Sequence, residues 1–147
     1  MDIDDTNIQI LRHLKDGRKS FKLIADELSI TENTIRSRVN KLIDEGVLKF
    51  SGTVQVDVLS GHNLLYLGVK LKNMELQKKA EEFSCLRGVV SAAIVTGRYD
   101  IILQVLLGPG YSLLEFITEQ VARIEDVQTV ESFIVYKGYN LKVPYIL

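Results

Sequence analysis

Residues 20–50, SFKLIADELSITENTIRSRVNKLIDEGVLKF, carry the pattern of two amphipathic helices joined by a short turn. In the second helix, apolar residues recur at positions i, i+4, i+7 and i+8 and form one stripe: Ile35, Val39, Leu42 and Ile43. Thr31 is a suitable N-cap, because its hydroxyl can accept a hydrogen bond from a first-turn amide. Gly46 is the expected stop signal, so this helix should span residues 31–45.

The opposite side of this helix is polar. Asn and Ser side chains can hydrogen-bond to base edges, and Arg and Lys can reach phosphates or guanine acceptors. The candidate DNA-binding residues are Asn33, Thr34, Arg36, Ser37, Arg38, Asn40 and Lys41. This pattern predicts a recognition helix that enters the major groove of double-stranded DNA. An ordinary solvated surface helix shows the same pattern, so the helix alone leaves both interpretations open.

Two more helices are expected before it. The helix that starts at Ser20 has one apolar side, made of Phe21, Ile24, Ala25 and Leu28. Residues 4–15 form another, with an inward side of Ile3, Ile8, Leu11 and Leu14. The short spacing between the second and third helices is typical of a helix-turn-helix, and residues 47–50 could add a strand as a minimal wing. Residues 1–50 are therefore predicted to be a DNA-binding domain.

The charge balance is unusual for such a domain. The chain has a net charge of −1, and residues 1–50 contain nine Lys or Arg and nine Asp or Glu. Because phosphate neutralisation supplies most non-specific affinity, one copy should bind DNA weakly. Useful affinity would need several copies held together, so we expect an oligomer.

The remaining composition is that of an ordinary globular protein. No apolar run approaches the roughly 20 residues that span a bilayer, and no signal-peptide pattern opens the chain. The single cysteine, Cys85, excludes an internal disulfide. We expect a cytoplasmic protein without membrane association.

The second half of the chain follows the order strand, helix, strand, strand, helix, strand, over residues 64–71, 75–83, 89–95, 101–107, 112–123 and 127–136. This order predicts an α+β fold whose ferredoxin-like βαββαβ domain spans residues 64–147. Residues 51–63 would be a linker, with a short strand at Thr53–Val58 that could pair across a dimer. The segment 112–123 is expected to be capped by Ser112 and to bury Leu113, Leu114, Phe116, Ile117 and Val121.

Two strands, LLYLGVKL at 64–71 and IILQVLL at 101–107, are apolar on both faces. Such a pattern suits a sheet that is covered on both sides. This half of the chain offers no third helix for the second face, so face-to-face dimerisation of the sheets is predicted. The alternative is that the N-terminal domain folds back onto that face.

The connection Thr96–Asp100 is the best candidate for a small-molecule contact. Gly97 can adopt a positive φ and allow close approach of a ligand, and Asp100 can accept from an ammonium group. Arg98 could pair with an anion, and Tyr99 offers an amphipathic ring. The same residues are also good hairpin chemistry, so both readings stay open.

These motifs together resemble the leucine-responsive regulatory protein/asparagine regulator (Lrp/AsnC, or feast/famine) family. The resemblance covers Ile10-Leu11-X-X-Leu14, Asp16-Gly17-Arg18, Thr34–Val39, Glu45-Gly46-Val47 and Thr96–Asp100. It implies a winged helix-turn-helix domain joined to a RAM-type ferredoxin-like domain, in a transcriptional regulator that forms dimers, tetramers or octamers. It further implies an amino-acid or related effector between second domains, contacted by Gly97, Arg98, Tyr99 and Asp100, with Thr129 and Ser132 completing the site.

Two other functions are alternatives for this architecture. Siroheme decarboxylases resemble the same architecture, but this chain has only His13 and His62 and shows no catalytic triad, paired carboxylates or metal-spaced cluster. We therefore expect no enzyme activity, cofactor or metal. A metabolite sensor that does not bind DNA is the other alternative, and it would fit the neutral charge balance.

Overall fold

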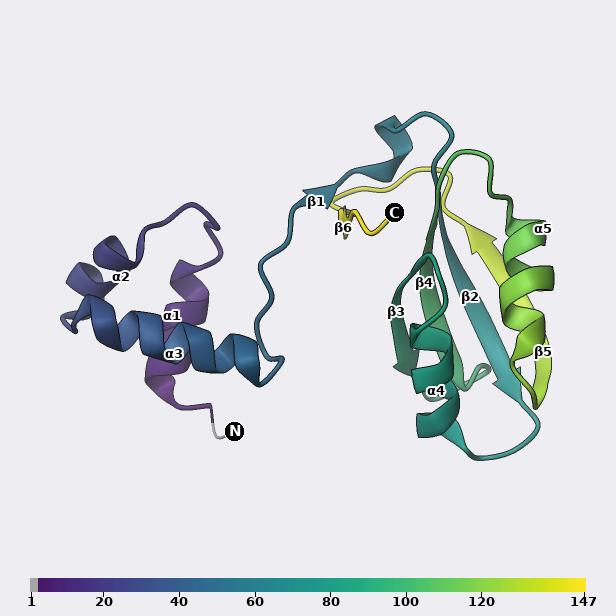
Figure 1. The fold of residues 1–147 in the computed structure, drawn as a ribbon, viewed down its shortest axis with the longest axis horizontal. Helices are drawn as coiled ribbons and strands as arrows, with labels where there is room; N and C mark the ends of the chain where they lie inside the picture. The colour runs from purple at the N-terminus through teal and green to yellow at the C-terminus, as the bar shows by residue number, and fades with distance from the viewer. Residues whose placement is uncertain (1–2) are drawn as a thin grey trace. The chain divides into compact units, whose positions relative to one another are not determined.

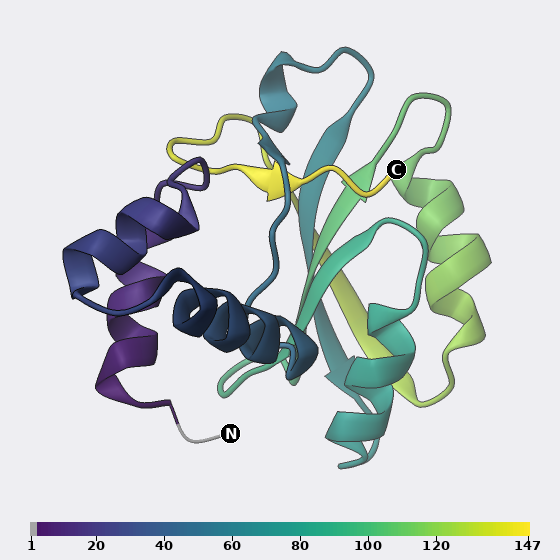
Figure 2. The same cartoon turned by 60° about the vertical axis from the view of Figure 1, so that its left-hand side comes forward.

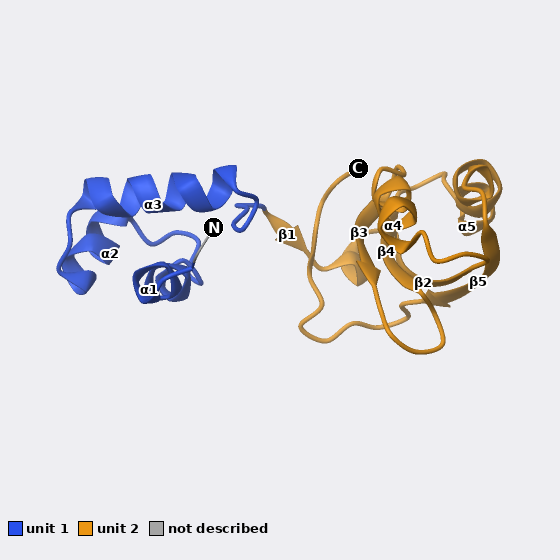
Figure 3. Ribbon diagram, turned by 90° about the horizontal axis from the view of Figure 1, so that it is seen from below, with its two compact units in different colours: residues 1–51 blue, residues 52–147 orange. Residues whose placement is uncertain are grey.

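The computed structural model describes residues 3–147, and the chain divides at Ser51 into two compact units, residues 1–51 and 52–147 (Figure 3). Within the described residues, no helix is both long and apolar enough to cross a membrane.

The first unit consists of three helices, α1 (Asp5–His13), α2 (Phe21–Leu28) and α3 (Glu32–Asp44) (Figure 1). Each begins at a residue whose side-chain oxygen accepts from a first-turn backbone amide: Asp4, Ser20 and Thr31. The predicted caps Ser20 and Thr31 are therefore confirmed. The helices enclose a small core of Ile10, Ile24, Ala25, Ile35 and Val39.

Two predicted core residues of this unit are exposed instead. Ile8 lies outside the core because the buried side of α1 runs through Asn7 and Ile10. One residue along a helix turns the side chain by about 100°, which carries Ile8 to the solvent side. Ile43 is exposed for the same reason, since its neighbour Leu42 points inward.

The wing strand predicted at residues 47–50 is absent: this described segment has no strand. Gly46 adopts a φ of +71°, which ends α3 as expected. The backbone amides of Val47 and Leu48 then both donate to the Leu42 carbonyl, at 2.9 and 3.0 Å. Two amides used to close the helix are not available to a strand ladder, which explains the difference.

The second unit is a four-stranded antiparallel sheet of order β3-β4-β2-β5 with two helices on one face (Figures 1 and 3). Its elements are β2 (Asn63–Leu71), α4 (Leu76–Ser84), β3 (Val89–Ile94), β4 (Ile101–Leu107), α5 (Leu113–Glu115) and β5 (Val127–Ile134). This confirms the predicted βαββαβ order. The core between sheet and helices is built from alternate strand residues and from Phe83 and Phe116.

The second helical segment is irregular. The α-helix at Leu113–Glu115 continues as a π-helical turn (Phe116–Gln120) and a 3-10 turn (Val121–Arg123). Ser112 caps it as predicted, through a capping box with Glu115. Leu114 was expected to be buried but is 71% exposed, because Leu113 and Phe116 take the inward side of this turn.

The short strand expected at Thr53–Val58 differs from the prediction in its length and its partner. Only Thr53–Val54 forms a strand (β1), and it pairs antiparallel with β6 (Val143–Pro144) of the same chain; Val56–Val58 is a 3-10 turn. Val56 and Val143 pack on Leu64 and Leu106, which lie on the sheet face opposite the helices. One end of that second face is therefore covered by the chain itself, where a partner had been expected.

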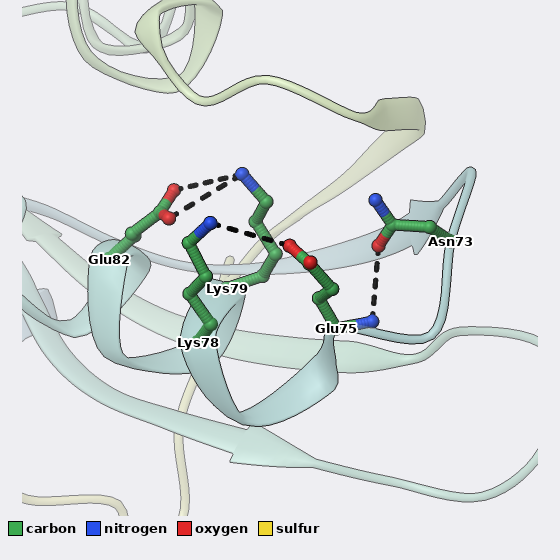
Figure 4. A network of polar contacts seen from close by, with 5 residues as sticks. All are labelled: Asn73, Glu75, Lys78, Lys79 and Glu82. Carbon is green, nitrogen blue, oxygen red and sulfur yellow. Dashed lines mark hydrogen bonds and ion pairs between the residues drawn. The ribbon is translucent and has the colours of Figure 1, made fainter.

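Helix α4 carries a buried lysine on its sheet-facing side. The Nζ atom of Lys79 pairs with Glu82 at 3.1 Å, and Lys78 pairs with Glu75 at 3.4 Å (Figure 4). A buried ammonium group is costly unless it is paired, and Glu82 supplies the partner one turn away. These contacts stabilise α4 locally.

Candidate DNA-binding face and effector loop

The outer face of α3 presents most of the predicted DNA-binding residues. Ile35, Val39 and Leu42 are buried and fix the helix on its unit. Six of the seven predicted residues are exposed on the other sides: Asn33, Thr34, Arg36, Ser37, Asn40 and Lys41. Amide, hydroxyl and cationic groups are thus available together on a single helix surface, as contact with base edges and phosphates requires.

Arg36 is anchored but accessible. Its Nη2 atom donates to Glu32 Oε1 at 2.8 Å, and its guanidinium lies 5.4 Å from the centre of the Phe21 ring. The side chain remains 55% exposed. A guanidinium has five N–H donors, so this anchoring leaves donors for a phosphate.

Arg38, the seventh predicted residue, is half-buried and its guanidinium is engaged by other residues of the first unit. Its Nη1 atom donates to both carboxylate oxygens of Asp4, at 2.9 and 2.7 Å, and to Asn7 Oδ1 at 3.0 Å. The Arg38 hydrogen bond is the main cause that lowers the pKa of Asp4 below its ordinary value. Asp4 also accepts from the Asn7 amide as the cap of α1, so Arg38 ties α3 to the start of α1.

Asp4 and Asn7 were not predicted as site residues. With Arg38 they line a shallow depression beside Asn33, Thr34, Ser37 and Lys41. No helical period of α3 points to them, because they lie more than 30 residues away in the sequence. The burial of the polar residue Asn7 is visible only in the structure, because the apolar pattern had placed Ile8 on the inward side.

In the loop before β4, Asp100 is already engaged. Its Oδ1 atom accepts from Lys70 Nζ at 2.7 Å and its Oδ2 atom accepts from the Leu71 amide at 2.8 Å. The Leu71 amide, followed by Lys70, lowers the pKa of Asp100. The side chain is 15% exposed, so in this structure Asp100 pins the loop to β2.

Tyr99 lies flat against β2. A Cβ atom on Gly68 would fall 2.7 Å from three atoms of the Tyr99 ring, so only glycine permits this packing. The Tyr99 hydroxyl donates to Glu131, which raises the pKa of Tyr99, and Arg98 pairs with the same carboxylate at 3.1 Å. Sequence reasoning missed Gly68 and Glu131, because only the β2–β5 pairing brings them beside the loop.

The strand register places the other two predicted effector residues, Thr129 and Ser132, on opposite faces of the sheet. Directly opposed residues of an antiparallel pair share a face, and Thr129 pairs with Lys70 on the face that carries the loop. Ser132 pairs with Leu67, whose side chain lies in the core under the helices. The structure therefore brings Thr129 toward Gly97–Asp100 but places Ser132 on the other face. Gly97 itself has a φ of +119°, as expected for this turn.

Over the described residues, no cluster of three His, Cys, Asp or Glu could hold a metal ion. His13 contacts Lys19 and Glu27 in the first unit, whereas His62 contacts Tyr145 in the second. The two histidines thus each belong to a separate local contact.

Comparisons with known proteins agree with this architecture. A winged helix-turn-helix DNA-binding family model matches residues 3–49, and the Lrp/AsnC ligand binding domain matches residues 64–142. The chain is 31% identical over 134 residues to an uncharacterised HTH-type transcriptional regulator of Pyrococcus abyssi, covering 90% of this chain and 85% of that protein.

Solved structures give the same result. The crystal structure of PH0061 superposes with a TM-score of 0.81 at 26% identity, over 97% of this chain and 99% of that one. A transcriptional regulator of Neisseria meningitidis, solved as a complex with L-methionine, has the same fold at 20% identity and a TM-score of 0.68, over 92% of this chain and 91% of that one.

A helix-turn-helix unit with a polar recognition helix, followed by a ferredoxin-like ligand-binding domain, defines a class of DNA-binding transcriptional regulator. The chain belongs to the Lrp/AsnC family of these regulators.

Proposed function

We propose that this regulator reads DNA with the outer face of α3. Asn33, Ser37 and Asn40 would contact base edges, and Arg36 and Lys41 would contact phosphates. The observation that carries this proposal is the exposure of all five side chains on one helix whose opposite side is buried. Thr34 and Arg38 belong to the same predicted set, with Arg38 acting mainly through its tie to Asp4.

The regulator would bind as a homodimer or a larger assembly, such as a tetramer or octamer. Residues 1–50 are electrically neutral, so a single recognition helix offers few net charges to the phosphate backbone. Two α3 helices could enter successive major grooves about one helical turn apart. The part of the sheet face not covered by β6, which carries Tyr66, Ile102 and Phe133, is the proposed contact surface.

An amino acid or related metabolite is the proposed effector, bound between second units beside Gly97, Arg98, Tyr99 and Asp100. The Neisseria regulator bound to L-methionine motivates this choice. Because both Asp100 oxygens accept from the chain itself, Asp100 would hold the loop in shape or exchange Lys70 for the effector's ammonium group. Thr129 lies on the same sheet face as the loop and could contact the effector directly. Ser132 lies on the other face, so it could reach the effector only around the edge of β5. We further propose a cytoplasmic protein without enzyme activity.

The direct test is DNA binding by the full chain, measured by electrophoretic shift on the segment upstream of its own gene. Replacing Asn33, Ser37 and Asn40 together with alanine should remove sequence-specific shifts and leave weak non-specific ones. Arg123→Ala, an exposed change in the second unit, is the matched control and should shift DNA like the wild type. If the triple variant keeps its sequence preference, α3 is not the reading helix.

The effector is tested by repeating the shift assay with a panel of amino acids. A concentration-dependent change that Gly97→Val removes supports the loop as the effector site. A change that persists in that variant places the effector elsewhere.

A further inference from the structure

A small cavity lies in the second unit at the end of β4, away from the loop at 97–100. Its walls include Leu106 from β4, Pro109 and Tyr111 from the β4–α5 connection, Arg87 from the turn before β3, and Leu147 from the C-terminal segment. Figure 2 shows the C-terminal segment beside that connection. The volume is about 140 Å³.

The walls are fixed by specific contacts. Gly88 has a φ of +92° and its carbonyl accepts from the Leu106 amide at 2.7 Å, and a Cβ atom on Gly88 would fall 2.9 Å from the Leu106 carbonyl oxygen. The C-terminal segment is held by Tyr145, whose hydroxyl lies 3.2 Å from His62 Nε2. The cavity is therefore bounded on one side by the hydrogen-bonded backbone of Gly88 and Leu106 and on the other by the C-terminal segment.

One wall residue carries a buried polar atom without a partner, and another is an exposed cation. The Tyr111 hydroxyl is the buried side-chain polar atom without a hydrogen-bond partner among the described residues. The Arg87 guanidinium lies 5.7 Å from the centre of the Tyr111 ring, and no carboxylate of residues 3–147 pairs with it. A guanidinium has five N–H donors, and a cation–π contact uses none of them as a conventional hydrogen bond, so donors remain for an anion. A cation with free donors beside an unpaired hydroxyl is a suitable pair for a carboxylate.

We propose that this cavity binds a small aliphatic carboxylate. Arg87 would pair with the carboxylate, the Tyr111 hydroxyl would donate to one of its oxygens, and the short chain would pack on Leu106, Pro109 and Leu147. The volume equals that of about five waters in liquid, well below the volume of pockets for drug-sized ligands, so an acid of about three or four carbons fits.

The lining also distinguishes this ligand from an amino acid. No Asp or Glu side chain lines the cavity, so its one charged side chain is the cation of Arg87, which repels an α-ammonium group. The cavity shares no residue with Gly97–Asp100, Gly68 or Glu131. It is a second site of a different chemical class from the proposed effector site.

The test uses the ¹⁵N-labelled full chain titrated with propionate, its neutral isostere propionamide, and L-alanine. Propionate should shift the amide signals of Gly88, Gly108 and Gly110 in a saturable way, while propionamide and L-alanine should bind at least about tenfold more weakly. Tyr111→Phe keeps the ring and removes only the unpaired hydroxyl, so it should fold normally and weaken propionate binding by about tenfold. Arg87→Gln should remove the binding, and Arg123→Gln should not.

Three results would overturn the proposal. One is the absence of saturable shifts with propionate up to about 50 mM, because a ligand with a millimolar Kd would saturate the cavity below that concentration. Another is equal binding of all three probes, which shows no role for charge. The last is unchanged propionate affinity in Tyr111→Phe together with a lower melting temperature, which shows that the hydroxyl serves the fold through a bound water.

Discussion

Replacing Arg36 and Arg38 separately with alanine should distinguish DNA contact from helix positioning. Both residues lie on α3, and each change removes one positive charge. Arg36 is 55% exposed, whereas Arg38 is 33% exposed and donates to Asp4 and Asn7. We expect Arg36→Ala to weaken DNA binding with little loss of stability. Arg38→Ala should lower the melting temperature of the first unit and affect DNA binding mainly through that loss.

The salt dependence gives the size of the effect. Each phosphate contact contributes about −0.9 to the slope of log K against log salt concentration. A dimer that loses Arg36 from both copies loses about two contacts, so its slope should become shallower by about 1.8. KCl rises roughly fourfold from 50 to 200 mM. Over this range the fold-loss of affinity of the wild type should be about 12 times the fold-loss of the variant.

Fluorescence anisotropy with a labelled operator duplex at three salt concentrations measures these slopes, and Arg123→Ala serves as the equal-charge control. Asp4→Asn adds a further check, because it weakens the hold on Arg38 and removes a negative charge beside the DNA-binding face. Its slope should steepen even as its melting temperature falls. The reasoning is refuted if Arg38→Ala flattens the slope as much as Arg36→Ala at an unchanged melting temperature.

Three further changes test the packing. Gly68→Ala should cost about 1–3 kcal/mol in urea unfolding, because its Cβ would displace the aromatic ring above it, whereas Gly17→Ala, with nothing within 4 Å, should be nearly neutral. Ile35→Ala should cost about 2–5 kcal/mol, while the exposed Ile8→Ala should cost little; equal losses would contradict the observed burial. Asp100 has a lowered pKa in the folded state, so its contribution to stability is complete above the ordinary carboxyl pKa and is lost as pH falls through the lowered value. The stability gap between wild type and Asp100→Asn should therefore be constant from pH 7 to about 5 and shrink below about pH 4; a gap that grows on acidification would reverse the sign.

The sequence predicts the elements of this fold well where a period is regular. The caps Ser20, Thr31 and Ser112 and the βαββαβ order follow from local chemistry, and the structure has them. The errors in burial fall one residue from an inward-facing position, at Ile8, Ile43 and Leu114, where the buried side of the helix is narrower than the apolar pattern suggests.

Contacts between segments far apart in the sequence could not be predicted from local patterns. The Arg38–Asp4 pair joins residues 34 apart, and Glu131 reaches Tyr99 only through the pairing of β2 with β5. The pairing of β1 with β6 likewise depends on where the C-terminal segment returns, and no local period encodes that return. The predicted DNA-binding and effector residues stay predictions about contacts, although the structure shows which of them are exposed.

Hydroxyl-radical footprinting on the upstream DNA tests most directly whether α3 helices read DNA in pairs. The account predicts two protected segments on one side of the duplex, about one helical turn apart, which disappear in the Asn33, Ser37 and Asn40 triple alanine variant. Continuous protection without this period, or a paired footprint that survives in the triple variant, would contradict it.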